Sequence, residues 1–162
     1  MSQENVAAAK EAYKAFGQGD IAGAVAGMDE NAEWVTSDEL PLGGTLHGRE
    51  EIAQAWARIP DYFDEFSVEP DEFIDAGDVV VVHGMQHARA KETGVSFDCA
   101  YLQLLRMRDG KTVRGEFFAD SAKALHVWMK RVALSAESTN RTPPLTLGWL
   151  ATIPRGRPLS RA

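Results

Sequence analysis

The chain has 162 residues, of which 44% are hydrophobic and 25% are charged, values typical of one globular domain. Its formal net charge of −7 at pH 7 argues against a nucleic-acid-binding protein, because such proteins usually carry a basic face. The N-terminus is polar and no apolar stretch is long enough to span a membrane, so neither a signal peptide nor a membrane partner is expected. The single cysteine, Cys99, cannot form an internal disulfide. We therefore expect a soluble cytoplasmic protein.

The charge is distributed unevenly along the sequence. Residues 127–162 contain six Lys or Arg residues and one acidic residue, which gives this segment a charge of +5 and leaves −12 for residues 1–126. Four of the seven prolines also lie in the C-terminal segment. The composition therefore predicts a folded domain at residues 1–126 and a basic, proline-containing extension at residues 127–162, partly disordered toward its end.

The first 60 residues predict three helices. The first runs to about Phe16, where the sequence Gly17-Gln18-Gly19 ends it. A short second helix follows Asp20, a residue type that often caps helix N-termini. A third helix is expected at about residues 49–59, and Pro60 should end it.

The rest of the domain has the two-residue period of β-strands. One strand is expected at residues 32–36, followed by a glycine-rich loop at residues 37–48. The sequence Asp109-Gly110 is a strong hairpin signal between two alternating segments. Four longer strands are expected at about residues 66–74, 78–90, 95–107 and 112–119. This order predicts an α+β fold, in which a curved antiparallel sheet packs on three N-terminal helices and encloses an apolar pocket.

Alternation assigns the two faces of the strand at residues 95–107. Tyr101 and Gln103 are expected to face the pocket, because Arg106 lies on the opposite face. Leu102 and Leu104 would then be exposed on the outer face of the sheet. Exposed leucines on a sheet predict a homodimer formed through that face.

Five short segments have a familiar order and spacing: Phe-Gly-Gln-Gly-Asp at residues 16–20, the strand at 32–36 with Trp34, Gly-Arg-Glu-Glu-Ile at 48–52, Arg-Asp-Gly-Lys-Thr-Val at 108–113, and Glu-Phe-Phe-Ala-Asp at 116–120. Over about residues 3–125 the chain resembles the superfamily of nuclear transport factor 2, ketosteroid isomerase, SnoaL-type polyketide cyclases and limonene-epoxide hydrolase. The resemblance implies a cystatin-like, cone-shaped fold, which hosts enzymes, binding modules and adaptors.

The resemblance to SnoaL-type cyclases implies an acid/base role for Asp120. In those cyclases a histidine stands where this chain has Gln103, which can hydrogen-bond a carbonyl or an enolate but cannot transfer a proton. In apolar surroundings the pKa of the Asp120 carboxyl would rise toward the range that suits proton transfer. The alternatives are that Asp120 only caps the following helical turn and that Gln103 is a core residue bonded to the backbone.

Other members of the superfamily use residues that this chain lacks. Ketosteroid isomerase uses an aspartate base, a tyrosine and a protonated aspartic acid. The resemblance puts Thr36, Ala12 and Gln103 at these positions, with Tyr13 next to Ala12. The epoxide hydrolase requires an Arg-x-Asp sequence in the strand at residues 78–90, which has histidines and a glutamine instead.

Further side chains are expected to bind a ligand, because the core and the pocket wall are one surface in this fold. They are Tyr13, Phe16, Trp34, Thr36, Trp56, Tyr101, Phe118, His83 and His87. A surface or structural role is the alternative for each histidine. The two histidines are about 13 Å apart on a strand, so they cannot share a metal ion, and no metal site is expected.

Three functions fit the sequence. In the first, the protein is an enzyme that performs cofactor-independent acid/base chemistry, of the isomerase, cyclase or epoxide-hydrolase type, on a hydrophobic substrate, with Asp120 moving the proton and Gln103 orienting the substrate. In the second, it is a non-catalytic binding module for a small apolar ligand. In the third, it is a dimeric adaptor that binds other proteins through the outer sheet face or the basic extension.

Overall fold

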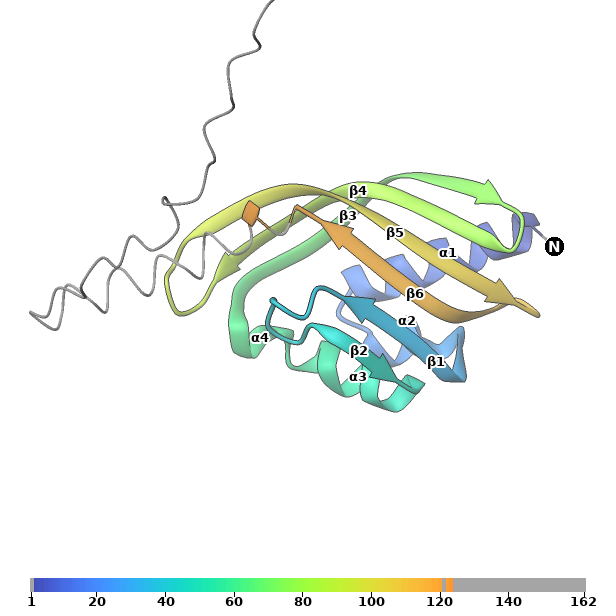
Figure 1. Cartoon of the computed structure of the whole chain (residues 1–162), viewed down its shortest axis with the longest axis horizontal. Helices are drawn as coiled ribbons and strands as arrows, with labels where there is room; N and C mark the ends of the chain where they lie inside the picture. The colour runs from blue at the N-terminus through green and yellow to red at the C-terminus, as the bar shows by residue number, and fades with distance from the viewer. Residues whose placement is uncertain (1, 121, 124–162) are drawn as a thin grey trace, which may run out of the picture.

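A curved six-stranded sheet arches over the helices, which lie against its concave face (Figure 1). The computed structural model describes residues 2–120 together with residues 122 and 123. The expected α+β architecture, with N-terminal helices under a curved sheet, is confirmed. The expected extension at residues 127–162 lies outside the described residues. No helix in the described part of the chain is both long and apolar enough to cross a membrane.

The helices begin and end close to where the sequence predicts, with one exception. They span Ser2–Gly17 (α1), Ile21–Ala26 (α2), Arg49–Ala57 (α3) and Ile59–Tyr62 (α4). Asp20 caps α2, its Oδ1 atom accepting the Gly23 N–H at 2.8 Å. The single helix expected at 49–59 is divided after α3, because Pro60 has no N–H to donate to the Trp56 carbonyl and cannot continue that helix. Pro60 lies instead in the first turn of α4, where a missing N–H costs nothing.

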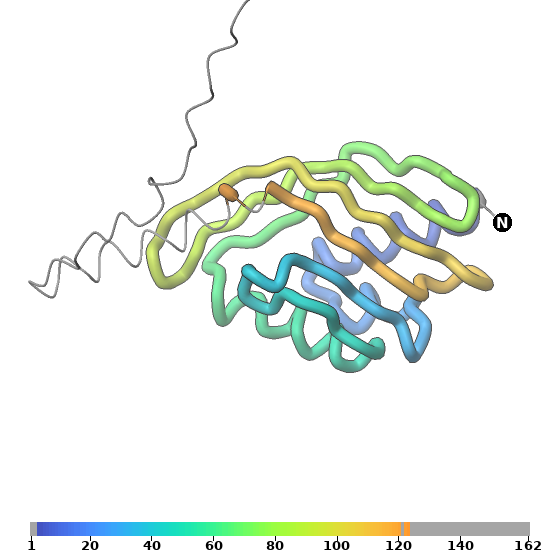
Figure 2. Tube along the Cα trace, in the orientation of Figure 1, coloured from blue at the N-terminus to red at the C-terminus, as the bar shows by residue number. Residues whose placement is uncertain are grey.

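The strands span Met28–Thr36 (β1), Gly44–His47 (β2), Phe63–Ala76 (β3), Val79–Ala90 (β4), Ser96–Arg108 (β5) and Lys111–Ala119 (β6). Their order in the sheet is β2-β1-β6-β5-β4-β3. The chain trace in Figure 2 shows β1 beside β6, far apart in sequence, and this pair is parallel, whereas the other pairs are antiparallel. β2 lies within the segment expected to be a loop; as a four-residue edge strand it is too short to show a period.

A bulge in β3 brings its backbone close to β4. The pairing with β4 shifts between Pro70 and Glu72, since a proline cannot donate to the ladder. Gly84 pairs with Pro70, and a Cβ on Gly84 would stand 2.2 Å from the Glu69 carbonyl oxygen. Glycine is therefore required at position 84.

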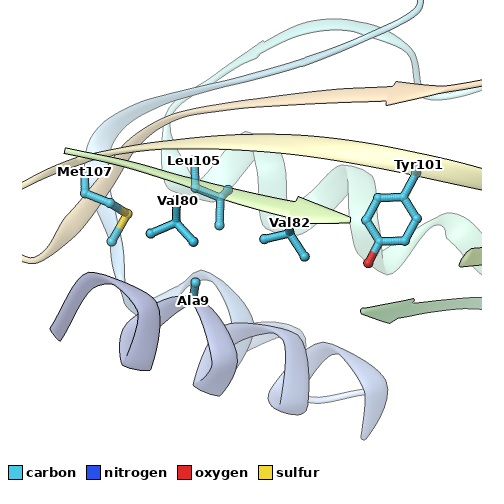
Figure 3. Packing of buried hydrophobic residues seen from close by; sticks show 6 residues of the cluster. All are labelled: Ala9, Val80, Val82, Tyr101, Leu105 and Met107. Carbon is cyan, nitrogen blue, oxygen red and sulfur yellow. The ribbon is translucent and has the colours of Figure 1, made fainter. Parts of the chain in front are cut away.

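The main core lies between α1 and the middle of the sheet. Ala9 of α1 faces Val80 and Val82 of β4, while Leu105 and Met107 of β5 complete the layer (Figure 3). Burial alternates along both strands, as period-two side chains must.

The predicted faces of β5 are confirmed. The exposed fractions of Tyr101 and Gln103 are 1% and 2%, whereas that of Leu102 is 46%. Leu104, expected to be exposed with Leu102, is half-buried. The concave face of the sheet is therefore the face that meets the helices and the pocket.

Candidate functional site

A cavity of about 170 Å³ lies between the concave face of the sheet and the helices. Aromatic rings from helices and strands form much of its wall: Tyr13, Phe16, Trp34, Trp56, Phe63, Phe66, Phe97 and Phe117. Such a cavity is close in size to one of about 150 Å³ known to hold benzene. Its dimensions suit a molecule of one or two rings.

Two tryptophans form one side of the cavity and depend on a glycine. The rings of Trp34 (β1) and Trp56 (α3) meet edge to face, with centroids 4.8 Å apart. Phe16 meets Trp56 in the same way at 5.2 Å. A Cβ on Gly115 of β6 would stand 2.4 Å from the Trp34 ring, so the indole occupies the space that a side chain at 115 would need.

The loop between β1 and β2 contributes three further residues to the wall, Leu40, Pro41 and Leu42. Two tight turns shape this loop: the Leu40 N–H donates to the Ser37 carbonyl at 3.2 Å, and the Gly43 N–H donates to the Leu40 carbonyl at 2.9 Å. Leu42 has a φ of 61°, which is unusual for a residue with a side chain. Sequence reasoning missed this part of the wall, since a proline- and glycine-rich segment indicates only a loop.

Tyr13 and Gln103 form a polar pair in the wall. The Tyr13 hydroxyl donates a hydrogen bond to Gln103 Oε1. Burial raises the pKa of the Tyr13 phenol far above its ordinary value, and the nearby Tyr101 hydroxyl raises it further. Tyr13 is therefore a neutral donor at physiological pH.

Tyr101 lies behind this wall, although it was expected in it. Its ring is parallel to those of Tyr13 and Phe117, at centroid distances of 6.4 and 5.0 Å. Among the described residues its buried hydroxyl has no hydrogen-bond partner. The Tyr101 and Tyr13 hydroxyls are close enough to affect each other's pKa, but they do not meet in hydrogen-bonding geometry.

Gln86 is a second amide in the wall, and sequence reasoning did not select it. The Cys99 thiol donates to Gln86 Oε1 at 3.7 Å. Burial raises the pKa of Cys99, so the thiol keeps the proton that it donates. The alternation of β4 could have identified Gln86, since it lies four residues from the inward-facing Val82.

His83 and His87 lie on the outer face of the sheet, so the expectation that they line the pocket is wrong. Alternation along β4 turns odd-numbered side chains away from the cavity. His87 Nδ1 is 2.6 Å from Asp98 Oδ1, and its Nε2 is 3.8 Å from Glu69 Oε2. The hydrogen bond to Asp98 raises the pKa of His87.

Phe118 is also outside the pocket, contrary to expectation. It is 54% exposed on the outer face, opposite Leu102, and Phe117 takes its expected place in the wall. The next outward position belongs to Asp120, which is exposed and whose Oδ1 accepts the Lys123 N–H at 3.4 Å. The apolar environment expected for Asp120 is not found among the described residues, and its acid/base role stays a prediction.

The remaining expected residues do lie in the wall: Tyr13, Phe16, Trp34, Thr36, Trp56 and Gln103. Their contact with a ligand stays a prediction. Of all the described wall residues, only Tyr13 has an ionisable side chain, and it is neutral. As far as the described part of the chain extends, the pocket therefore offers aromatic surface and neutral hydrogen-bonding groups, without a carboxylate or a histidine to exchange protons.

Comparison with known proteins assigns the fold and the family. Residues 9–115 match the SnoaL-like domain. The chain belongs to the SnoaL-like family. No curated protein matches it.

Solved structures extend the comparison. An NTF2-like protein of unknown function from Burkholderia pseudomallei is 29% identical, with a TM-score of 0.72 over 76% of this chain and 96% of that chain. TerC, co-crystallized with polyporic acid, is 32% identical, with a TM-score of 0.70 over 78% and 98% of the two chains. A protein with a cystatin-like fold from Xanthomonas campestris is 23% identical, with a TM-score of 0.69 over 76% and 97%, which supports the fold alone. The SnoaL-like superfamily includes polyketide cyclases and isomerases.

Proposed function

We propose that the SnoaL-like pocket binds a small, mainly apolar organic molecule of one or two rings. The observation that carries this proposal is the wall itself, in which aromatic rings surround a cavity of about 170 Å³. Burying apolar area contributes about 25 cal/mol per Å², so the wall supplies most of the binding free energy. The crystallisation of TerC, 32% identical to this chain, with polyporic acid supports a small-molecule occupant.

Calorimetric titration of the full-length protein with acetophenone tests this proposal. Ala12→Leu adds volume inside the wall and should weaken binding, whereas Ala7→Leu adds the same volume on the exposed side of α1 and should not. Because the described wall is uncharged, the Kd should change by less than about twofold between low and high salt. Absence of binding, or an equal effect of the two variants, would reject the proposal.

A second function is acid/base catalysis in the same pocket, and Tyr13 is the observation that favours it. Tyr13 donates its single O–H to the Gln103 oxygen, so the amide nitrogen of Gln103 can donate to a carbonyl oxygen and stabilise the enolate that forms there. Such a reaction also needs a group that removes a proton, and the described wall residues include no carboxylate or histidine. Asp120 is the candidate from the sequence, so unchanged turnover in Asp120→Asn would remove this function from consideration.

We also propose that two copies of the chain pair through the outer face of the sheet. The large hydrophobic side chains that are exposed in the described part of the chain are Ile74, Leu102 and Phe118. All three lie on that face, and Leu102 pairs with Phe118 across β5 and β6. Covering such a patch removes apolar area from water, which favours a symmetric dimer.

A further inference from the structure

Both glutamines of the pocket wall accept a hydrogen bond at the side-chain amide oxygen. Gln103 Oε1 accepts from the Tyr13 hydroxyl, and Gln86 Oε1 accepts from the Cys99 thiol. The residues are only 2% and 8% exposed. A side-chain amide carries two N–H donors on its nitrogen, so the group that each glutamine has available for a ligand is a donor.

The side-chain amides of Gln86 and Gln103 lie in different parts of the cavity wall. Gln86 pairs with Cys99 across β4 and β5, and Gln103 lies four residues further along β5. At about 3.3 Å per residue the two positions are about 13 Å apart along the strands. Both side chains project into the same cavity, so a ligand of one or two rings fits between their amide groups.

We infer that the pocket selects a molecule with a hydrogen-bond acceptor at each end of a ring body, such as a carbonyl oxygen on either side of an aromatic ring. This inference rests on the proposed function, since it concerns the ligand of the same pocket. A ligand without these acceptors leaves buried N–H groups unpaired, which weakens binding at least about fivefold for each missing acceptor. A ligand with hydroxyl groups at both ends also offers acceptors, because a hydroxyl oxygen carries two lone pairs.

Tyr13 and Cys99 are positioning residues in this arrangement, because they fix which end of each amide faces the ligand. Without its partner an amide can turn over and present its oxygen. Tyr13→Phe and Cys99→Ala should therefore reduce the preference for acceptor ligands at Gln103 and Gln86 respectively. Cys99→Ser keeps a donor at this position and should restore the preference.

A series of four compounds of similar shape tests the inference by calorimetric titration of the full-length protein. 1,4-Diacetylbenzene has two acceptors, 4-isopropylacetophenone has one, 1,4-diisopropylbenzene has none, and 1,4-bis(1-hydroxyethyl)benzene has hydroxyls in place of both carbonyls. The Kd should rise at least about fivefold from 1,4-diacetylbenzene to 4-isopropylacetophenone, and again from there to 1,4-diisopropylbenzene. The diol should bind more tightly than 1,4-diisopropylbenzene, because its hydroxyl oxygens can also accept from the amide nitrogens.

Two variants test whether the side-chain amides of Gln103 and Gln86 cause these differences in Kd. Gln103→Leu and Gln86→Leu should each remove one of the two steps in the series, because the replaced side chain no longer leaves a buried donor unpaired when the ligand lacks an acceptor. The series in the unmodified protein keeps the inference testable if either variant fails to fold. Thermal melts followed by circular dichroism identify such a failure.

The outcomes separate the two proposals. Equal affinity for the diketone, the diol and 1,4-diisopropylbenzene would reject donor-based selection while leaving an apolar binding pocket in place. The same rejection follows if the fivefold steps persist in both leucine variants. Failure of all four compounds to bind would reject the proposed function together with this inference.

Discussion

The Tyr13 hydroxyl on α1 donates a hydrogen bond to the side-chain oxygen of Gln103 on β5, 90 residues further along the chain. This bond joins a helix to the centre of the sheet and lies in the wall of the pocket. It also satisfies an amide oxygen that would otherwise be buried without a partner. The contact therefore contributes both to the fold and to the chemical character of the pocket.

Tyr13→Phe should lower the free energy of unfolding by about 1–3 kcal/mol, because it leaves Gln103 Oε1 buried and unpaired. Tyr101→Phe is the matched control, since the hydroxyl that it removes has no partner among the described residues. The free energy of unfolding of Tyr101→Phe should lie within about 0.5 kcal/mol of that of the unmodified protein, or be slightly higher. Urea unfolding measures both changes, and equal losses would contradict the assigned bond.

Gly115→Ala should destabilise the protein and displace Trp34, because the new Cβ would stand 2.4 Å from the indole ring. Overpacking of this kind typically costs about 1–3 kcal/mol. Gly17→Ala at the end of α1 is the control, since a Cβ there meets nothing within 4 Å. Thermal unfolding should detect a lower stability for Gly115→Ala and not for Gly17→Ala. An unchanged stability of Gly115→Ala would show that the Trp34 ring can move without cost.

The pKa of His87 should fall toward its ordinary value in Asp98→Asn, because the hydrogen bond to Asp98 is the main cause that raises it. A pKa that is higher in the folded state stabilises the protein below the unfolded-state pKa of about 6.5, and this stabilisation is lost as the pH rises through the higher folded-state value. The stability difference between the two proteins should therefore fade with increasing pH. NMR titration of the His87 imidazole checks the pKa, and an unchanged value in the variant would contradict the assignment.

Leu102→Glu should abolish the proposed dimer, because it introduces a charge opposite Phe118 in the exposed apolar patch. Ala7→Glu on the exposed side of α1 is the control and should leave the dimer intact. Sedimentation equilibrium measures the mass of each protein in solution. A monomeric unmodified protein, or a dimer that persists in Leu102→Glu, would contradict pairing through this face.

Strict alternation along the sequence predicts which side of the sheet each side chain of the long strands occupies. Tyr101 and Leu102 are on the predicted sides, because a period of two leaves no other arrangement. The same rule, applied from the inward Val82, assigns Gln86 to the pocket and His83 to the outside. The imidazole chemistry of His83 and His87 favours a ligand-binding role, but their odd-numbered positions on β4 place both side chains on the outer face.

Other features could not be derived from local sequence. β2 is four residues long and lies among glycines, so no period is visible. The bond between Tyr13 and Gln103 depends on how α1 packs on the sheet, and neither residue specifies its partner. Asp120 follows β6, and the sequence does not say which face of the sheet each residue of that strand occupies. The pairing of Phe118 with Leu102 assigns Phe118 to the outer face.

The most direct test of the pocket's character is an NMR titration of the full-length protein with 1,4-diacetylbenzene, observing the side-chain NH₂ resonances of Gln86 and Gln103. Both pairs of resonances should shift on binding, because each nitrogen donates to a carbonyl oxygen of the ligand. Binding that leaves both amide signals unchanged would contradict the account, and so would shifts confined to the outer face of the sheet.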